Sequence, residues 1–145
     1  MSASNNFETN SLKLIFNNTT YALIGDATGI VGSGAAGSLY VSLHTADPGE
    51  AGDQTTNETS YTSYARVAVA RTTGGWTVSG NAVTPVAAIT FPACTGSTAT
   101  ITHFGVGTAS SGAGVLLFSG TVTSNISVSS GVTPSLTTAT SISCD

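Results

Sequence analysis

The residues most able to do chemistry stand close together in the stretch SLHTAD. Ser42 and His44 lie two positions apart, and Asp47 follows three positions later. Alternate residues of a strand share one face, so Ser42 and His44 are expected to touch. Serine, histidine and aspartate are also the parts of a hydrolytic triad. A nucleophilic serine, however, sits at a strained turn beside oxyanion-binding amides, and this stretch has no such turn. We therefore interpret it as the end of a strand that enters a loop, without catalysis.

The loop that follows gathers most of the acidic residues of the chain. Four of the seven stand in DPGEAGDQTTNE: Asp47, Glu50, Asp53 and Glu58. Calcium loops place oxygen ligands at alternate positions and close with a bidentate acid, whereas these acids are spaced three, three and five apart. We predict a solvated loop of roughly 20 residues, with no metal and no cofactor. A weak metal site at an interface is the alternative.

The remaining candidates for binding are a histidine and three aromatic residues. His103 stands in ITHFGVG and is predicted to be a hydrogen-bonded structural histidine, because a zinc ion would need more histidine or cysteine donors nearby. Trp76, Tyr61 and Tyr64 could form a platform on which a sugar stacks. For Trp76, a position in the core of a sandwich is the simpler interpretation.

The composition excludes several classes of function. Only 7% of the 145 residues are charged, against roughly 25% in an average domain, and 20 Ser and 25 Thr provide a polar surface without charge. With three cations and a net charge of −4, the chain has no basic patch for nucleic acid or an anionic membrane. The N-terminus does not resemble a signal peptide, so we expect folding in the cytoplasm where the chain is made. For Cys94 and Cys144, reduced thiols are expected, and a single bridge is the alternative.

The N-terminal segment is expected to form a helix followed by an irregular arm. Residues 2–17 carry apolar side chains at helical spacing, with Ser4 or Asn5 as the cap and Glu8 in the first turn. Phe7, Leu14 and Ile15 are predicted to share one face, with Leu12 and Phe16 beside it. The glycine- and alanine-rich segment 25–38 cannot continue the helix.

The rest of the chain has the pattern of a β protein. Short alternating runs recur every 8 to 15 residues from position 38 onward and are separated by Gly, Ser, Asn or Pro. This spacing predicts an antiparallel β-sandwich or a small barrel. We expect residues 1–37 to form an N-terminal helix and arm, and residues 38–145 to form the β-domain.

Several phrases, taken in order, resemble a known family. SLYVSLHTADPG, SYARVAVART, AITFPA, ITHFGVGTASSGAG and LLFSGTV are similar to a widespread family of small virion proteins of tailed bacteriophages, and FETNSLKLIF resembles the opening helix of that family. The resemblance implies a structural part of the particle, without catalytic residues.

Composition and resemblance together favour a protein that acts by binding, located in the virion. We expect a capsid decoration or cement protein that binds the major capsid protein or other virion proteins; the alternative is a tail, collar or head fibre subunit, which would contact the host surface and its glycans. A homo-oligomer is expected, and shell symmetry makes a trimer the natural guess. The residues expected to bind the partner are those of the N-terminal helix: Phe7, Leu12, Leu14, Ile15 and Phe16.

Overall fold

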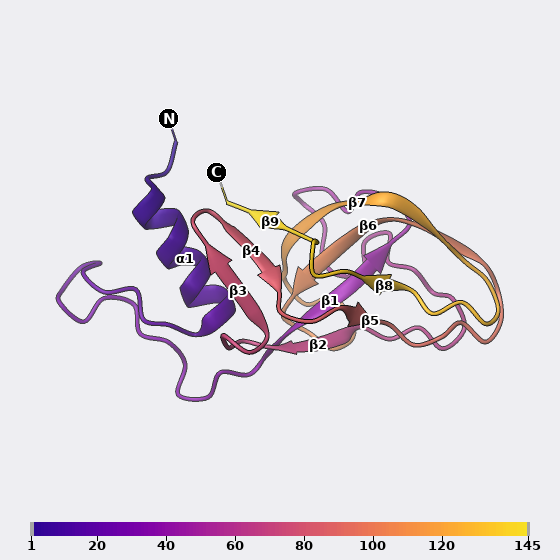
Figure 1. The fold of residues 1–145 in the computed structure, drawn as a ribbon, viewed down its shortest axis with the longest axis horizontal. Coiled ribbons are helices and arrows are strands. Elements are labelled where there is room, and N and C mark those ends of the chain that lie inside the picture. Colours follow the sequence, from indigo (N-terminus) through magenta and orange to yellow (C-terminus); the bar gives the residue numbers. More distant parts are fainter. Residues whose placement is uncertain (1, 145) are drawn as a thin grey trace. The chain divides into compact units, whose positions relative to one another are not determined.

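The computed structural model describes residues 2–144, which form antiparallel strands and a helix near the N-terminus (Figure 1). The helix α1 spans Asn5–Asn17. The strands are β1 Ser38–His44, β2 Val67–Ala70, β3 Trp76–Ser79, β4 Ala82–Pro85, β5 Ile89–Thr90, β6 Ala99–Gly107, β7 Leu116–Val128, β8 Ser135–Leu136 and β9 Ile142–Ser143. The predicted mainly-β fold class is confirmed. The sheets fit a sandwich and do not close into a barrel.

Contacts group the chain into two compact units, which we describe separately. The helix unit comprises Met1–Ser38, Val69–Ala87 and Thr137–Asp145, and the sheet unit comprises Leu39–Ala68 and Ala88–Leu136. The division at residues 37 and 38 was drawn from composition and stays a prediction. Met1 and Asp145, the two ends of the predicted segments, lie outside the described residues.

Helix α1 begins and ends where its capping residues direct. The Ser4 hydroxyl accepts a hydrogen bond from the amide of Phe7 at 3.3 Å, which satisfies one of the free amides of the first turn. At the other end Asn18 adopts a left-handed conformation with φ 54°, and its amide bonds to the carbonyl of Lys13. The predicted helix and its Ser4 cap are therefore confirmed.

The apolar face predicted for α1 is wrong, because the face that is buried is a neighbouring one. The buried residues are Glu8, Leu12 and Phe16, which follow one another at four-residue spacing and so lie on one stripe. Phe7 is 48% exposed. The stripe faces the sheet of its own unit, where the ring of Phe16 meets the ring of Trp76 edge-on with centroids 5.0 Å apart.

The helix unit is built by packing α1 on a small sheet. Its strands run in the order β3-β4-β9, and α1 packs against β3 and β4 (Figure 1). Two side chains tie the helix to the β3–β4 hairpin: Thr9 donates to the carbonyl of Gly80 at 2.8 Å, and Asn17 donates to the carbonyl of Trp76 at 2.9 Å. Trp76 is buried, as predicted for a core residue.

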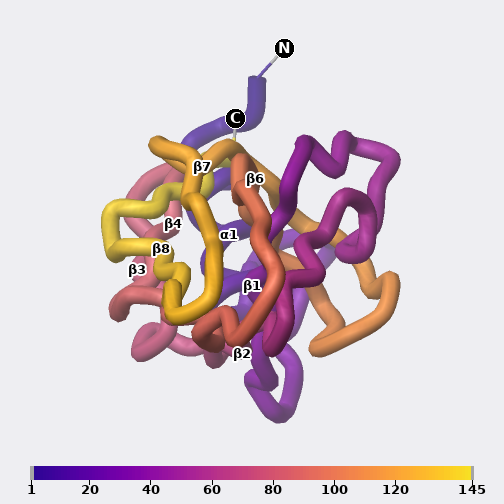
Figure 2. The backbone as a smooth tube through the Cα atoms, turned by 90° about the vertical axis from the view of Figure 1, so that its right-hand side faces the viewer, coloured from indigo at the N-terminus to yellow at the C-terminus, as the bar shows by residue number. Residues whose placement is uncertain are grey.

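The sheet unit is organised around the central strand β6, which lies between β1 and β7 (Figure 2). The full order is β2-β1-β6-β7, and the register of β1 with β6 places His44 opposite His103. The β6–β7 ladder is interrupted between Ile101 and His103, where β7 carries extra residues. A separate pair, β5 with β8, joins Ile89 to Leu136. The core includes the buried side chains Val41, Leu43, Phe91, Ile101, Phe104 and Val106.

Three details of the strand pattern differ from the prediction. Strand β4 follows β3 through a two-residue turn at Gly80 and Asn81, and the sequence had suggested no strand there. Strand β8 was also missed, because a pair of residues is too short to show alternation. The sequence pattern predicts two separate runs, at 114–122 and 125–130, whereas most of these residues form the single strand β7, because a bulge keeps the chain in the sheet.

Candidate functional site

Ser42 and His44 do touch, but they are sealed in the interior of the sheet unit. The Ser42 hydroxyl lies 2.8 Å from Nε2 of His44, and both residues are 0% exposed. Nδ1 of His44 lies 2.8 Å from the carbonyl of Thr56. A carbonyl can only accept, so Nδ1 carries the proton and Nε2 accepts from the serine. Burial lowers the pKa of His44 below its ordinary value, which keeps the ring neutral.

Asp47 does not complete a triad. It lies exposed on the loop after β1, where its Oδ1 accepts from the amide of Gly49 at 2.9 Å and stabilises a turn. Where a triad would have an aspartate, Nδ1 of His44 has a backbone carbonyl as its partner. Ser42 and His44 therefore form structural hydrogen bonds at the end of strand β1. The interpretation of SLHTAD as a strand entering a loop agrees with this geometry.

The acidic residues of the loop serve different structural purposes and do not converge. Among residues 2–144 there is no group of three or more His, Cys, Asp or Glu side chains placed to hold a metal ion. Asp53 accepts from both the hydroxyl and the amide of Thr55, at 2.6 and 2.7 Å. These hydrogen bonds hold the pKa of Asp53 below its usual value.

Glu58 forms a largely buried ion pair in the sheet unit, and for this residue the prediction of a solvated loop is wrong. Its carboxylate accepts hydrogen bonds from Nε and one Nη of Arg66, both at 2.7 Å, and from the Tyr64 hydroxyl at 2.9 Å. The side chains of Arg66 and Glu58 are 2% and 15% exposed. A bidentate pair of this kind is much stronger than a surface salt bridge.

The electrostatics around Arg66 and Tyr64 keep both side chains protonated. The hydrogen bonds and the negative charge of Glu58 raise the pKa of Arg66, and burial, which is the largest cause, raises the pKa of Tyr64 well above its ordinary value. Tyr64 therefore stays protonated and can donate to Glu58, while it accepts from the amide of Leu43 at 3.0 Å.

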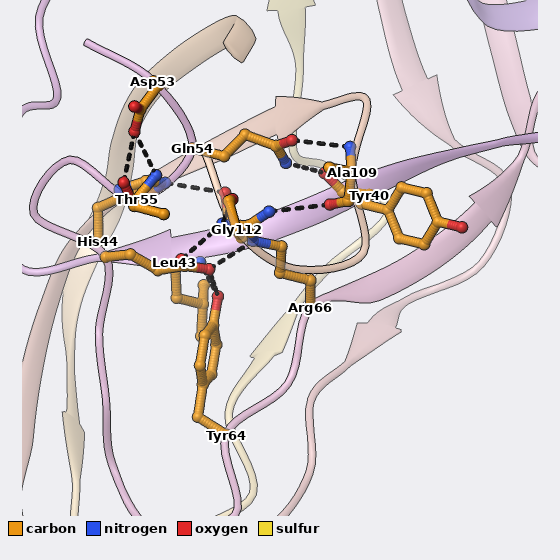
Figure 3. Close-up of polar contacts among 12 residues, drawn as sticks. Tyr40, Leu43, His44, Asp53, Gln54, Thr55, Tyr64, Arg66, Ala109 and Gly112 are labelled. Carbon is orange, nitrogen blue, oxygen red and sulfur yellow. Dashed lines mark hydrogen bonds and ion pairs between the residues drawn. The ribbon is translucent and has the colours of Figure 1, made fainter. Parts of the chain in front are cut away.

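Arg66 and Gln54 together hold the loop that connects β6 to β7. Arg66 donates to the carbonyls of Ala109 and Gly112 at 2.9 and 2.8 Å. Gln54 is fully buried: its Oε1 accepts from the amide of Ala109 at 2.8 Å, and its Nε2 donates to the carbonyl of Tyr40 at 3.4 Å (Figure 3). The long acidic loop thus works as a brace for residues 108–114.

Sequence reasoning missed Gln54, although two glycines mark its position. A Cβ added at Gly107 would lie 2.2 Å from Cδ of Gln54, and one at Gly114 would lie 2.3 Å from its Oε1. A glycine inside a strand often marks a close approach by another group. Gly107 at the end of β6 was such a signal, but it does not say which residue approaches.

The other candidates for binding are withdrawn from the surface or bonded locally. Trp76 and Tyr61 are buried and Tyr64 is half-buried, so they offer no open platform on which a sugar could stack. His103 is half-buried, and its Nδ1 lies 2.8 Å from the hydroxyl of Thr102. The two cysteines are free thiols; Cys94 is buried and Cys144 is half-buried.

The predicted partner-binding residues of α1 are placed very differently from one another. Leu12 and Phe16 are fully buried inside the helix unit, and Leu14 and Ile15 are half-buried. Only Phe7 is well exposed. A role of these residues in binding a partner stays a prediction, and in this conformation Phe7 is the one whose side chain is most available.

The segment after α1 carries exposed apolar side chains that are not among the residues predicted to bind the partner. Leu23 is 80% and Val31 is 60% exposed, and Ile24 and Ile30 are also exposed. The signal was present in the sequence as YALIGDATGIV, where apolar residues stand among glycines without helical or strand periodicity. We call residues 21–31 the apolar hairpin, because Tyr21 and Ile30 pair in antiparallel orientation.

The comparisons with known proteins agree with a particle component. No curated protein matches the chain, and no helix in residues 2–144 is long and apolar enough to cross a membrane. A family described as "Podophage GP4 fiber I protein gp80" matches residues 2–143, which is nearly the whole chain. The chain therefore belongs to this family of tailed-phage virion structural proteins.

Proposed function

We propose that the chain is a subunit of a fibre on the phage particle, and that it acts by binding other virion proteins and catalyses no reaction. The observation that carries this proposal is the family match over residues 2–143 to a fiber I protein. Because the match includes both units, the whole chain is expected to serve the role that the family name describes.

The geometry supports a role in binding. Ser42 and His44, which lie within hydrogen-bond distance of each other as a nucleophile and its base would, are closed to solvent. A substrate could not reach this pair without opening the sheet. The polar network of Glu58, Arg66 and Gln54 is satisfied by the chain itself, which is typical of a structural brace.

Capsid decoration is the second candidate, and the exposed apolar surface favours it. A decoration protein clamps neighbouring shell subunits, and Leu23 and Val31 offer apolar area for such contacts. The chain also has no heptads or repeats from which a long shaft could form. We further propose that copies associate, with a trimer as the starting hypothesis, and that assembly takes place in the host cytoplasm. In a fibre, the chain would also contact glycans of the host surface.

The position and number of copies in the particle test the proposal. The chain should be found in purified virions, and gold-labelled antibody should mark the tail or the head-to-tail region in tens of copies or fewer. Hundreds of copies spread over the head would instead support capsid decoration. Absence of the chain from purified particles would refute both roles.

A further inference from the structure

The exposed apolar side chains of the molecule are concentrated near the N-terminus. In the described part of the chain, the large hydrophobic residues that are exposed are Phe7, Leu23, Ile24, Ile30, Val31, Val86 and Val115. Four of these lie in the apolar hairpin, and Phe7 is joined to it through Tyr21, with ring centroids 6.1 Å apart. Single exposed apolar residues are ordinary on a protein surface, but a cluster of them indicates an interaction site.

The hairpin is held in shape by hydrogen bonds of its own. Tyr21 and Ile30 exchange two backbone bonds of 2.9 Å, and the carboxylate of Asp26 accepts from the amides of Thr28 and Gly29 at 2.8 and 2.9 Å. At Gly29 a Cβ would lie 2.1 Å from the carbonyl of Tyr21, so the turn closes tightly. The chain therefore presents these side chains in a defined arrangement.

The base of the hairpin is fixed to the helix unit. Asn18 donates to the carbonyl of Ser33 at 2.7 Å and accepts from the Ser33 amide at 2.7 Å. The Arg71 guanidinium donates to the carbonyl of Ala36 at 3.2 Å and to the carbonyls of Leu14 and Ile15 at 2.9 and 2.7 Å. A fixed base lets the hairpin bind without losing much conformational freedom.

Leu23 provides an independent sign that the hairpin is shaped for contact. Its φ is 67°, in the left-handed region that disfavours a leucine and suits glycine. The same side chain is 80% exposed, so no packing within the chain compensates for this conformation. A strained residue that points an apolar side chain into water is consistent with a role in binding.

The charges and the size of the hairpin restrict what can cover it. Asp26 is the only charged residue between positions 18 and 38, so no cation draws the hairpin to an anionic membrane. Contact between two hairpins would involve a few side chains on each side, well short of the roughly 800 Å² per partner of a stable interface. A narrow apolar projection buries most of its surface only inside a groove.

We propose that the apolar hairpin, residues 21–31, together with Phe7, inserts into an apolar groove on a different protein of the virion. This inference rests on the proposed function, because it takes the partner to be another component of the particle. It places the attachment surface on the hairpin and not on Leu12 and Phe16, which the helix unit itself buries.

The test uses purified chain added to particles of the phage that encodes it, prepared without the gene for this chain. Occupancy is measured by quantitative gel densitometry across a concentration series. Leu23→Asp and Val31→Asp should each need at least about tenfold more protein for half-occupancy, because a buried aliphatic contact is worth about a decade of affinity or more. Val86→Asp is the matched control: this valine is also exposed in the helix unit but lies outside the hairpin.

A second variant separates binding from folding. Leu23→Gly removes the side chain and relieves the left-handed conformation, so the melting temperature should stay the same or rise while occupancy falls. If Leu23→Gly lowers the melting temperature and binds normally, the residue has a folding role and the inference is wrong.

The remaining outcomes overturn the inference in different ways. Equal occupancy by wild type and all aspartate variants would show that attachment uses another surface, while the proposed function would still hold. Failure of the wild-type chain to bind, together with its absence from native particles, would refute the proposed function itself. If light scattering shows that the wild-type chain forms an oligomer and the hairpin variants do not, while particle binding is unaffected, the hairpin binds a second copy of the chain. If the wild-type chain floats with phosphatidylglycerol vesicles and the hairpin variants do not, the hairpin binds a membrane.

Discussion

Removing the carboxylate of Glu58 is expected to destabilise the sheet unit strongly. In Glu58→Ala the guanidinium of Arg66, whose side chain is 2% exposed, loses two hydrogen bonds of 2.7 Å and the Tyr64 hydroxyl loses its acceptor. Breaking a buried ion pair from one side costs about 3–5 kcal/mol. We expect the lower end, about 3 kcal/mol, because two carbonyls still accept from Arg66.

The assay is thermal unfolding followed by circular dichroism. A loss of about 3 kcal/mol corresponds to a drop in melting temperature of about 6–12 °C for a chain of this size. Glu50→Ala is the control, since Glu50 is an exposed acid in the same loop, and it should change stability by less than about 0.5 kcal/mol. If Glu58→Ala melts within about 2 °C of wild type, the loop is the solvated segment that the sequence suggested, and the brace does not stabilise the fold.

Three further predictions concern close packing, capping and pH. Gly107→Ala should cost about 1–3 kcal/mol by overpacking, because the new Cβ would lie 2.2 Å from Gln54. Gly74→Ala should be nearly neutral when both variants are unfolded with urea, and equal effects would contradict this prediction. Ser4→Ala should cost about 1 kcal/mol and reduce helix content, and unchanged helicity would show that the cap is dispensable. The pKa of His44 is lowered in the folded chain. As the pH falls, the unfolded chain therefore binds a proton on this histidine near about pH 6.5, while the folded chain does so only at a lower pH. The free energy of unfolding should thus fall from about pH 7.5 to about pH 5.5. A His44→Gln variant should lose part of this slope, and an unchanged slope would refute the buried neutral histidine.

Much of the fold could be predicted because it depends on local pattern. The cap at Ser4, the helix after it and the alternation in β1 and β6 are short-range features that single stretches of sequence reveal. The orientation of α1 could not be predicted in the same way. Leu12, Leu14, Ile15 and Phe16 allow more than one apolar face, and the choice depends on Trp76, which is distant in sequence.

The polar brace shows why the acidic loop was misread. From the sequence, Glu58 is one of four similar acids, and nothing local distinguishes it from Glu50. Glu58 stabilises the fold only because it pairs with Arg66. Arg66 in turn donates to the carbonyls of Ala109 and Gly112, which lie more than forty positions further along the chain. Long-range partners of this kind are fixed by topology and are not visible in composition or spacing.

The scarcity of cations has a consequence for proteolysis. Trypsin could cut this chain only after Lys13, Arg66 and Arg71. The first lies inside α1, and the two arginines are engaged by carbonyls of their own units. In the native molecule, trypsin therefore has little access to these three bonds. The order in which it cuts them would report which unit unfolds first.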